Sequence, residues 1–197
     1  MRVFVIAMEC EARCVRPHLK EGDRLIVSGI GKVNAAAAAQ KAISEFGASV
    51  IVNAGLAGGF GAEMNPGEVY EVSSAVEYDF DLAKLNGTAV GVLDEYDSPY
   101  LEAETVGLFP PRILATGDRF NDSEADYTLI RDVLGAGLRD MEGAAIAHVC
   151  KKNGVEFRSL KCVTNVAGRG SMTGQYENSK PECLAILTEA LGRYLDG

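Results

Sequence analysis

Strand-like runs of apolar and β-branched residues alternate with helix-like stretches along the chain. Such runs predict buried strands, and they lie at residues 3–7, 25–28, 49–53, 68–76, 112–116 and 156–164. Helical patterns lie between or after them, at residues 8–12, 35–42, 123–134 and 181–195. A further helical pattern begins at residue 143 and ends at a stop signal at 152–154. This alternation predicts an α/β fold whose mainly parallel or mixed sheet is covered by helices on both faces.

Two stretches depart from this alternation. The glycine-rich run at 54–61 follows an apolar strand directly, and we expect a loop whose backbone closely approaches a ligand, because glycine has no Cβ in the way. A flexible loop with positive φ angles is the alternative. Residues 84–111 are poorly periodic and predict a loop with a short strand, of the kind that lines sites or oligomer contacts.

Polar residues at strand ends are the first candidates for catalytic or ligand-binding roles. Open α/β sheets build their sites at the carboxyl ends of strands, which brings forward Glu11 after the first strand and Asn165 after the last. Glu142 precedes the small-residue helix that opens at Gly143, where the positive end of the helix dipole favours a carboxylate. A solvated carboxylate at the helix start is the alternative for Glu142.

Composition narrows the class of protein. With 197 residues, 47% of them hydrophobic, the chain is long enough for one compact domain over residues 1–197. The formal net charge of −9 argues against a nucleic-acid partner. The apolar run at the N-terminus is too short for a signal sequence or a span, so we expect a cytoplasmic protein without a membrane partner.

The cysteine pattern gives little support to a metal site. Five cysteines without a CxxC spacing predict free thiols. Cys10, Cys14 and His18 could share one helix face, but that spacing alone is weak evidence for a metal. We therefore expect no metal.

Five stretches in order carry a resemblance to a known family. Residues 7–11, 28–33, 53–59, 116–120 and 140–150 together resemble the nucleoside phosphorylase/nucleosidase superfamily, and within it the methylthioadenosine/S-adenosylhomocysteine nucleosidase branch. The resemblance covers almost the whole chain, with a middle shorter than is usual for the family. It implies a three-layer α/β/α sandwich around a twisted mixed sheet, commonly dimeric, which cleaves the bond between a purine and a ribosyl carbon without a metal or an organic cofactor.

The resemblance also implies roles for individual residues. It makes Glu11 the group that activates water, Met141 and Glu142 the pair that holds the ribose, and Phe120 the aromatic that stacks on the purine. The chain at Ala57 and Gly58 would pass close to the sugar and base, and Tyr176, in a late loop, could close over the 5′ group. Carboxylates near the ribose suit a reaction that passes through a cationic, oxocarbenium-like sugar, and one of them can take the proton of the attacking water.

Two positions depart from the nucleosidase pattern. Asn165 stands where the nucleosidases carry an aspartate that protonates or binds N7 of the leaving purine; an amide can donate a hydrogen bond but has no ionisable proton to give. Lys161 stands where they carry an arginine that helps to hold the catalytic glutamate, so the charge is kept but the planar fork is lost.

These observations predict a purine nucleosidase. The substrate would be a 5′-modified purine nucleoside such as methylthioadenosine or S-adenosylhomocysteine, and the enzyme a homodimer. Glu11 in the first loop would repel phosphate, and Leu56 replaces the serine that phosphorylases use, so water is the favoured nucleophile. Three alternatives remain open: a 6-oxopurine nucleosidase such as futalosine hydrolase, a purine nucleoside phosphorylase, and a non-catalytic nucleoside-binding homologue.

Overall fold

The computed structural model describes residues 1–93, 95–120 and 122–196. The strands are β1 (Arg2–Ile6), β2 (Arg24–Val27), β3 (Val50–Gly59), β4 (Val69–Glu77), β5 (Leu101–Glu102), β6 (Pro111–Thr116), β7 (Leu138–Asp140) and β8 (Glu156–Val166). The helices are α1 (Glu9–Val15), α2 (Lys32–Phe46), α3 (Ala83–Asn86), α4 (Glu124–Thr128), α5 (Gly143–Asn153) and α6 (Met172–Asp196), with a 3-10 turn at Arg16–His18 and a π-helical turn at Leu129–Val133.

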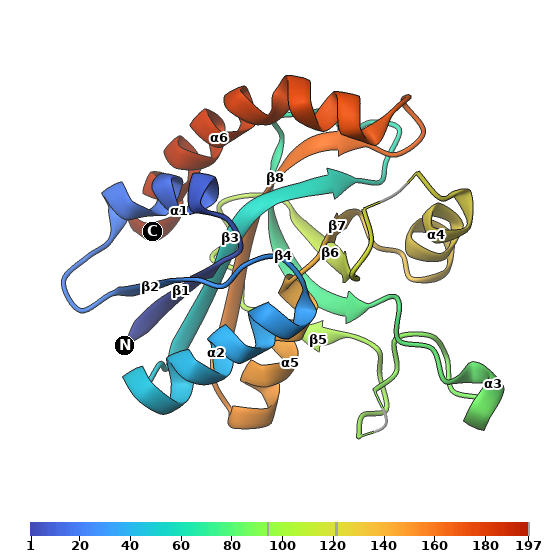
Figure 1. Ribbon diagram of the computed structural model, residues 1–197, viewed down its shortest axis with the longest axis horizontal. Coiled ribbons are helices and arrows are strands. Elements are labelled where there is room, and N and C mark those ends of the chain that lie inside the picture. The colour runs from blue at the N-terminus through green and yellow to red at the C-terminus, as the bar shows by residue number, and fades with distance from the viewer. Residues whose placement is uncertain (94, 121, 197) are drawn as a thin grey trace.

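The strands form one mixed sheet that closes on itself in part (Figure 1). Its order is β2-β1-β3-β7-β6-β4-β5, and β8 pairs with both β3 and β4. Strand β3 is parallel to β1 and β8 but antiparallel to β7, whereas β4 is parallel to β6 and antiparallel to β8. The path β3-β8-β4-β6-β7 therefore returns to β3, and the mixed sheet expected from the sequence is confirmed.

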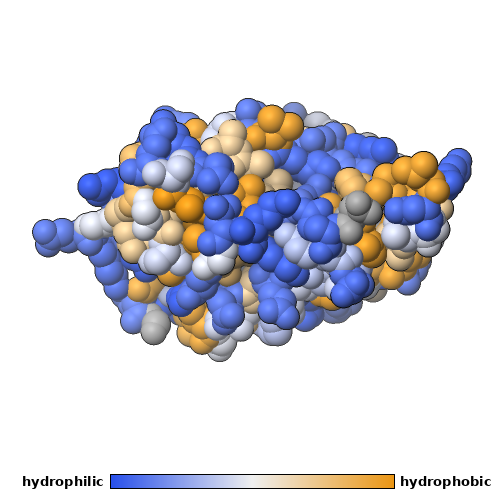
Figure 2. Space-filling model, turned by 90° about the horizontal axis from the view of Figure 1, so that it is seen from below, coloured by the Kyte–Doolittle hydropathy of each residue, from blue (hydrophilic) through white to orange (hydrophobic). Residues whose placement is uncertain are grey.

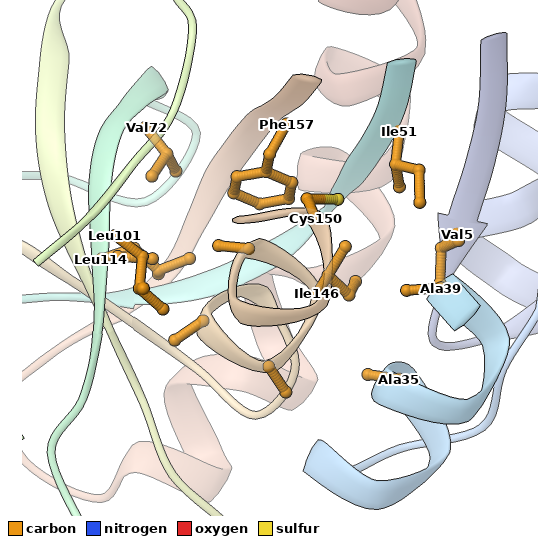
Figure 3. Close-up of a cluster of buried hydrophobic side chains, with 14 of the residues drawn as sticks. Val5, Ala35, Ala39, Ile51, Val72, Leu101, Leu114, Ile146, Cys150 and Phe157 are labelled. Carbon is orange, nitrogen blue, oxygen red and sulfur yellow. The ribbon is translucent and has the colours of Figure 1, made fainter. Parts of the chain in front are cut away.

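Helices pack against both faces of this sheet. Alternate residues of a strand point to opposite faces, and in β1 Val3 and Val5 join the core under α2 and α5, while Phe4 and Ile6 join the core under α1 and α6. Figure 3 shows the first of these cores, where Ile146 of α5 lies among side chains from the sheet and from α2. The second core lies on the side that carries α1 and α6 in Figure 1.

The predicted strands are all present, but the glycine-rich run is not a loop. Residues 54–59 continue β3, where Gly55 pairs with Lys161 and Gly58 with Asn165. Gly55, Gly58 and Gly59 do not have positive φ angles, so the flexible-loop alternative is also wrong. The physical reason is that β8 pairs with the whole segment and β7 pairs with Gly58 and Gly59 on its other side, so that the extended ladder satisfies backbone groups there.

The last helix also differs from the prediction. It begins at Met172 rather than at Pro181, so Tyr176 lies in a helix and not in a loop. Pro181 removes one hydrogen bond from the helix interior, which normally ends a helix. Here Cys183 and Leu187, on the following turns, are buried against the sheet and hold the helix in place.

The face of α2 and α3 is mixed in character. Figure 2 shows hydrophilic and hydrophobic atoms interspersed on the face seen from below in Figure 1. The most exposed apolar side chains, Leu85 and Val33, belong to different helices. None of the described helices is both long enough and apolar enough to cross a membrane.

Candidate active site

One cavity of about 480 Å³ gathers nearly all the residues singled out from the sequence. It is lined by the predicted catalytic residues Glu11, Glu142 and Asn165, and by Ala57, Gly58, Phe120, Met141 and Tyr176. These residues come from β3, β8, the start of α1, the segments flanking β6 and β7, and α6. Lys161 is the predicted site residue that does not line the cavity.

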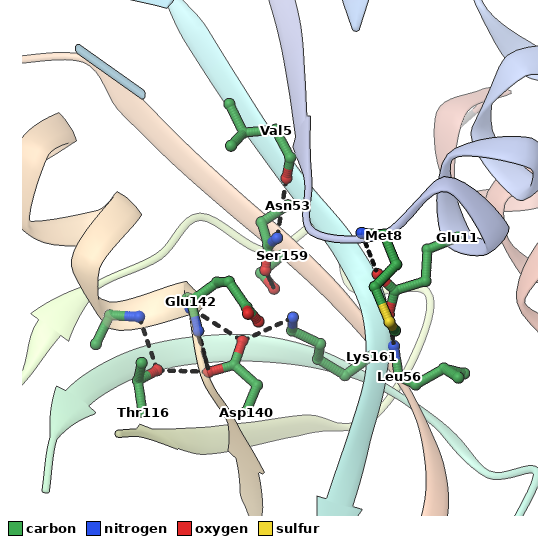
Figure 4. Close-up of polar contacts among 12 residues, drawn as sticks. Val5, Met8, Glu11, Asn53, Leu56, Thr116, Asp140, Glu142, Ser159 and Lys161 are labelled. Carbon is green, nitrogen blue, oxygen red and sulfur yellow. Dashed lines mark hydrogen bonds and ion pairs between the residues drawn. The ribbon is translucent and has the colours of Figure 1, made fainter. Parts of the chain in front are cut away.

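Glu11 is held by backbone groups at both carboxylate oxygens. Its Oε1 accepts a hydrogen bond from the Leu56 N–H at 2.8 Å, and its Oε2 accepts one from the Met8 N–H at 3.2 Å (Figure 4). Burial raises the pKa of Glu11, against the hydrogen bond from Leu56 and the positive charge of Lys161, which lower it. The carboxylate is thus fixed in place and more basic than an exposed one, as a proton acceptor requires.

Gly55 makes this position of Glu11 possible. A Cβ on residue 55 would lie 2.5 Å from Glu11 Oε1, too close for any side chain. We expect Gly55→Ala to displace the carboxylate and lower kcat by about 100-fold, because misplacing a catalytic group by roughly 1 Å costs that much. Gly174→Ala is the control: its Cβ would meet only Ser171, at an ordinary 3.8 Å. Equal kcat values for the two variants would contradict this account.

Glu142 lies at the N-terminus of α5, as predicted from the sequence. It is the residue before the first helical turn, and its Oε1 accepts a hydrogen bond from the Gly31 N–H at 2.9 Å. Burial and the neighbouring Asp140 carboxylate raise the pKa of Glu142 to about 7. The tight turn from Gly29 to Gly31 therefore serves to hold Glu142.

Lys161 lies behind the cavity, which corrects its assignment to substrate binding. Its ammonium is 2.8 Å from Asp140 Oδ2, and both side chains are almost fully buried (Figure 4). Burial lowers the pKa of Lys161, but the Asp140 and Glu142 carboxylates outweigh it and raise the pKa above the usual value. Lys161 reaches Asp140 because β8 places it inside the closed part of the sheet, where its side chain does not line the cavity.

Asp140 connects this lysine to the start of α5. Its Oδ1 accepts a hydrogen bond from Thr116 Oγ1 at 2.6 Å, and its Oδ2 accepts one from the Gly143 N–H at 2.9 Å. Thr116 Oγ1 in turn accepts from the Ala144 N–H. The network fixes the helix start and therefore the backbone that carries Met141 and Glu142.

Asn165 and the two aromatic residues lie in another part of the cavity wall. Thr164 Oγ1 donates to Asn165 Oδ1 at 2.9 Å, and Asn165 Nδ2 would be 3.1 Å from a Cβ on Gly58. Phe120 is 51% exposed, and its ring meets the Tyr176 ring edge-on with 5.9 Å between centroids. A flat ligand would find an aromatic face and an amide donor here.

The sequence analysis missed Arg139 as a site residue. It lines the cavity and is 4% exposed, and its guanidinium lies over the Phe60 and Tyr127 rings. The available signal was an arginine in a short segment between apolar residues. A strand of only three residues, such as β7, is too short to show a strand pattern in the sequence, so Arg139 was not predicted to lie at a strand end.

Other polar and sulfur-containing residues have ordinary structural contacts. Asp118 accepts a hydrogen bond from the Lys32 N–H and braces the turn before α2, and the half-exposed Arg119 pairs with the buried Asp126. His148 is partly buried and lies 3.3 Å from Glu95. The cysteines are free thiols, and the described part of the chain holds no cluster of three or more side chains suited to a metal ion.

Comparison with known proteins places this geometry in a family. The model of the phosphorylase superfamily matches residues 19–196. The chain is 32% identical over 179 residues to the 5′-methylthioadenosine/S-adenosylhomocysteine nucleosidase of Treponema pallidum, covering 73% of this chain and 66% of that protein. It is 30% identical over 164 residues to the aminodeoxyfutalosine nucleosidase of Campylobacter jejuni, covering 73% and 68%. The chain thus spans about two thirds of the length of these relatives.

Solved structures share the fold. The nucleosidase of Helicobacter pylori with butyl-thio-DADMe-Immucillin-A superposes with a TM-score of 0.87 at 18% identity, covering 100% of this chain and 98% of that one. The nucleosidase of Neisseria meningitidis with methylthio-immucillin-A gives 0.85 at 24% identity, covering 98% of each chain. The family model over most of the chain, together with these relatives, confirms the resemblance expected from the sequence: the chain belongs to the phosphorylase superfamily.

Proposed function

We propose that this protein hydrolyses the N-glycosidic bond of a purine nucleoside. The proposal rests mainly on the Glu11 carboxylate. It is buried, it accepts hydrogen bonds from two backbone N–H groups, and it lines the same cavity as Glu142. Relatives named for methylthioadenosine and S-adenosylhomocysteine support a 5′-modified nucleoside as the substrate. Helices on both faces of the sheet support the three-layer sandwich over residues 1–197, and a homodimer stays a prediction of the resemblance.

The proposed roles follow the charge that develops during the reaction. Glu11 takes the proton of the attacking water. Glu142 and Met141 hold the ribose, and the Glu142 carboxylate stabilises the cationic sugar. Phe120 stacks on the base, and Asn165 donates a hydrogen bond to N7.

Water suits this cavity better than phosphate. Glu11 and Glu142 both line it, and two carboxylates repel an anionic nucleophile. Leu56 occupies the serine position of the phosphorylases, and its N–H is used by Glu11. We therefore favour hydrolysis over phosphorolysis, and the paired carboxylates argue against a binding protein without activity.

A panel of nucleosides tests the proposal. Release of free base would be measured from methylthioadenosine, S-adenosylhomocysteine, adenosine, inosine and futalosine, each with and without phosphate. We expect release that does not depend on phosphate. Strict dependence on phosphate would indicate a phosphorylase, and tight binding without release would indicate a binding protein.

The raised pKa of Glu142 predicts that activity and stability change in opposite directions with pH. We expect kcat/KM to fall below pH about 7, because a protonated Glu142 no longer stabilises a cationic sugar. The folded chain keeps this proton up to a higher pH than the unfolded chain does, so the contribution to stability is full below the ordinary pKa and is lost as the pH rises through about 7.

Glu142→Gln separates the two effects. It should lower kcat/KM at pH 8 and reduce the fall in thermal midpoint between pH 5 and pH 7, in a pH series of activity and thermal unfolding. An unchanged stability slope in the variant would show that Glu142 does not titrate in this range.

A further inference from the structure

Arg139, Gly58 and Asn165 lie side by side on three neighbouring strands. Gly58 of β3 is in register with Arg139 of antiparallel β7 and with Asn165 of parallel β8. Residues in register across a sheet direct their side chains to the same face. Gly58 has no side chain, so the space above it is bounded by Asn165 on one side and by Arg139 on the other, and all three residues line the cavity.

The guanidinium of Arg139 is a fixed positive charge. It lies 5.7 Å from the Phe60 ring centroid and 5.8 Å from that of Tyr127, and its Nη2 is 2.9 Å from Met172 Sδ. Cation–π contacts of this kind stabilise and orient an arginine. Arg119 also lines the cavity, but its side chain is 55% exposed, so its charge is less fixed than that of Arg139.

This part of the cavity therefore offers hydrogen-bond donors. A guanidinium has only N–H donors, and Asn165 Oδ1 already accepts from Thr164 Oγ1, so that its Nδ2 is the atom nearest to Gly58. The carboxylates of Glu11 and Glu142 are held elsewhere, by Met8 and Leu56 and by Gly31. Glu177, on α6, is exposed at the cavity wall.

We propose that Arg139 is a base-selecting residue and that, with Asn165, it makes the site prefer a 6-oxopurine nucleoside over a 6-aminopurine one. The inference rests on the proposed function and names its substrate class. The edge of a 6-oxopurine presents two acceptors, N7 and O6, whereas the edge of adenine presents the N7 acceptor and an N6 donor. The N–H donors of Arg139 and Asn165 match both acceptors of the 6-oxopurine edge. At the adenine edge, one of these donors would face the N6 amino group, which is itself a donor.

The same charge would assist the departure of the base. In hydrolysis the water oxygen bonds to the ribosyl carbon while the carbon–nitrogen bond breaks and its electron pair stays on the purine. Glu11 receives the proton of the water and later returns it to solvent, and the purine anion takes its proton from solvent. Arg139 stabilises that anion before it is protonated, where Asn165 has no acidic proton to give.

Base binding to the unaltered protein is the first test, because it needs neither turnover nor a variant. Calorimetry would compare hypoxanthine with adenine, and we expect hypoxanthine to bind roughly 10- to 100-fold more tightly, the usual effect of one matched donor–acceptor contact. Tighter binding of adenine would overturn the inference even if nucleosides are hydrolysed. A failure to hydrolyse any nucleoside would overturn the proposed function while base binding still decides this inference.

Variants then assign the preference to Arg139. Arg139→Gln should lower the ratio of kcat/KM for inosine over adenosine by roughly 10-fold or more, and thermal unfolding would check that it folds. Arg139→Lys, which keeps the charge, serves if Arg139→Gln does not fold, and should retain part of the ratio. Arg119→Gln removes an equal charge at the same cavity and should leave the ratio unchanged. An equal loss of the ratio in Arg119→Gln would contradict a specific role for Arg139.

Discussion

Glu11→Gln is expected to lower kcat by about 10²- to 10⁴-fold, the range typical of removing a general base. The glutamine has the same shape and can still accept from the Leu56 N–H through its carbonyl oxygen. Its amide group cannot take a proton, and it would face the Met8 N–H donor that the carboxylate now accepts from. Steady-state kinetics on the preferred nucleoside would measure the change.

Two measurements separate this loss from unfolding. Burial disfavours the charged form of Glu11, and the gain from a neutral side chain offsets the lost hydrogen bond from Met8, so the thermal midpoint at neutral pH should stay close to that of the parent. Glu9→Gln is the matched control on the same helix, since Glu9 is exposed and pairs with Arg16 outside the cavity. Activity of Glu11→Gln equal to that of the parent would rule out Glu11 as the base.

Lys161→Met is expected to lower the free energy of unfolding by about 3–5 kcal/mol. Removing one partner of a buried ion pair leaves the other charge uncompensated, which is more costly than losing the pair as a whole. Here the remaining charge would be Asp140, whose side chain is 2% exposed. Chemical denaturation of parent and variant would measure the difference.

Lys152→Met is the control, because Lys152 pairs with Glu95 at the surface, with side chains 53% and 42% exposed. Its expected cost is about 1 kcal/mol or less. The double variant Lys161→Met with Asp140→Asn should lose less stability than Lys161→Met alone, since the Asp140 charge is then removed together with its partner. Equal losses in the Lys161 and Lys152 variants would show that burial of the ion pair does not matter.

Features that depend on neighbouring residues could be predicted from the sequence. Strands β1, β4 and β6 follow from local apolar runs, and the start of α5 follows from a carboxylate before small residues. The rule that sites form at strand ends brought forward Glu11 and Asn165, and both line the cavity.

Features that depend on distant partners could not be predicted. The glycine run looked like a loop because its partners on β8 lie a hundred positions away, and Lys161 looked like a ligand contact because only the closed sheet buries it against Asp140. The start of α6 was misplaced because burial of Cys183 and Leu187 outweighs the local effect of Pro181.

The closed path of strands has a consequence for how the chain folds. Its longest seam joins β3 to β8, two strands separated along the chain by residues 60–155. Loop closure over such a distance costs entropy before any contact forms, so folding is expected to be slow for a chain of this size. Glu11, held by Leu56 of β3, and Asn165 of β8 come together only when that seam forms. A chain in which that seam has not formed would therefore lack a complete active site.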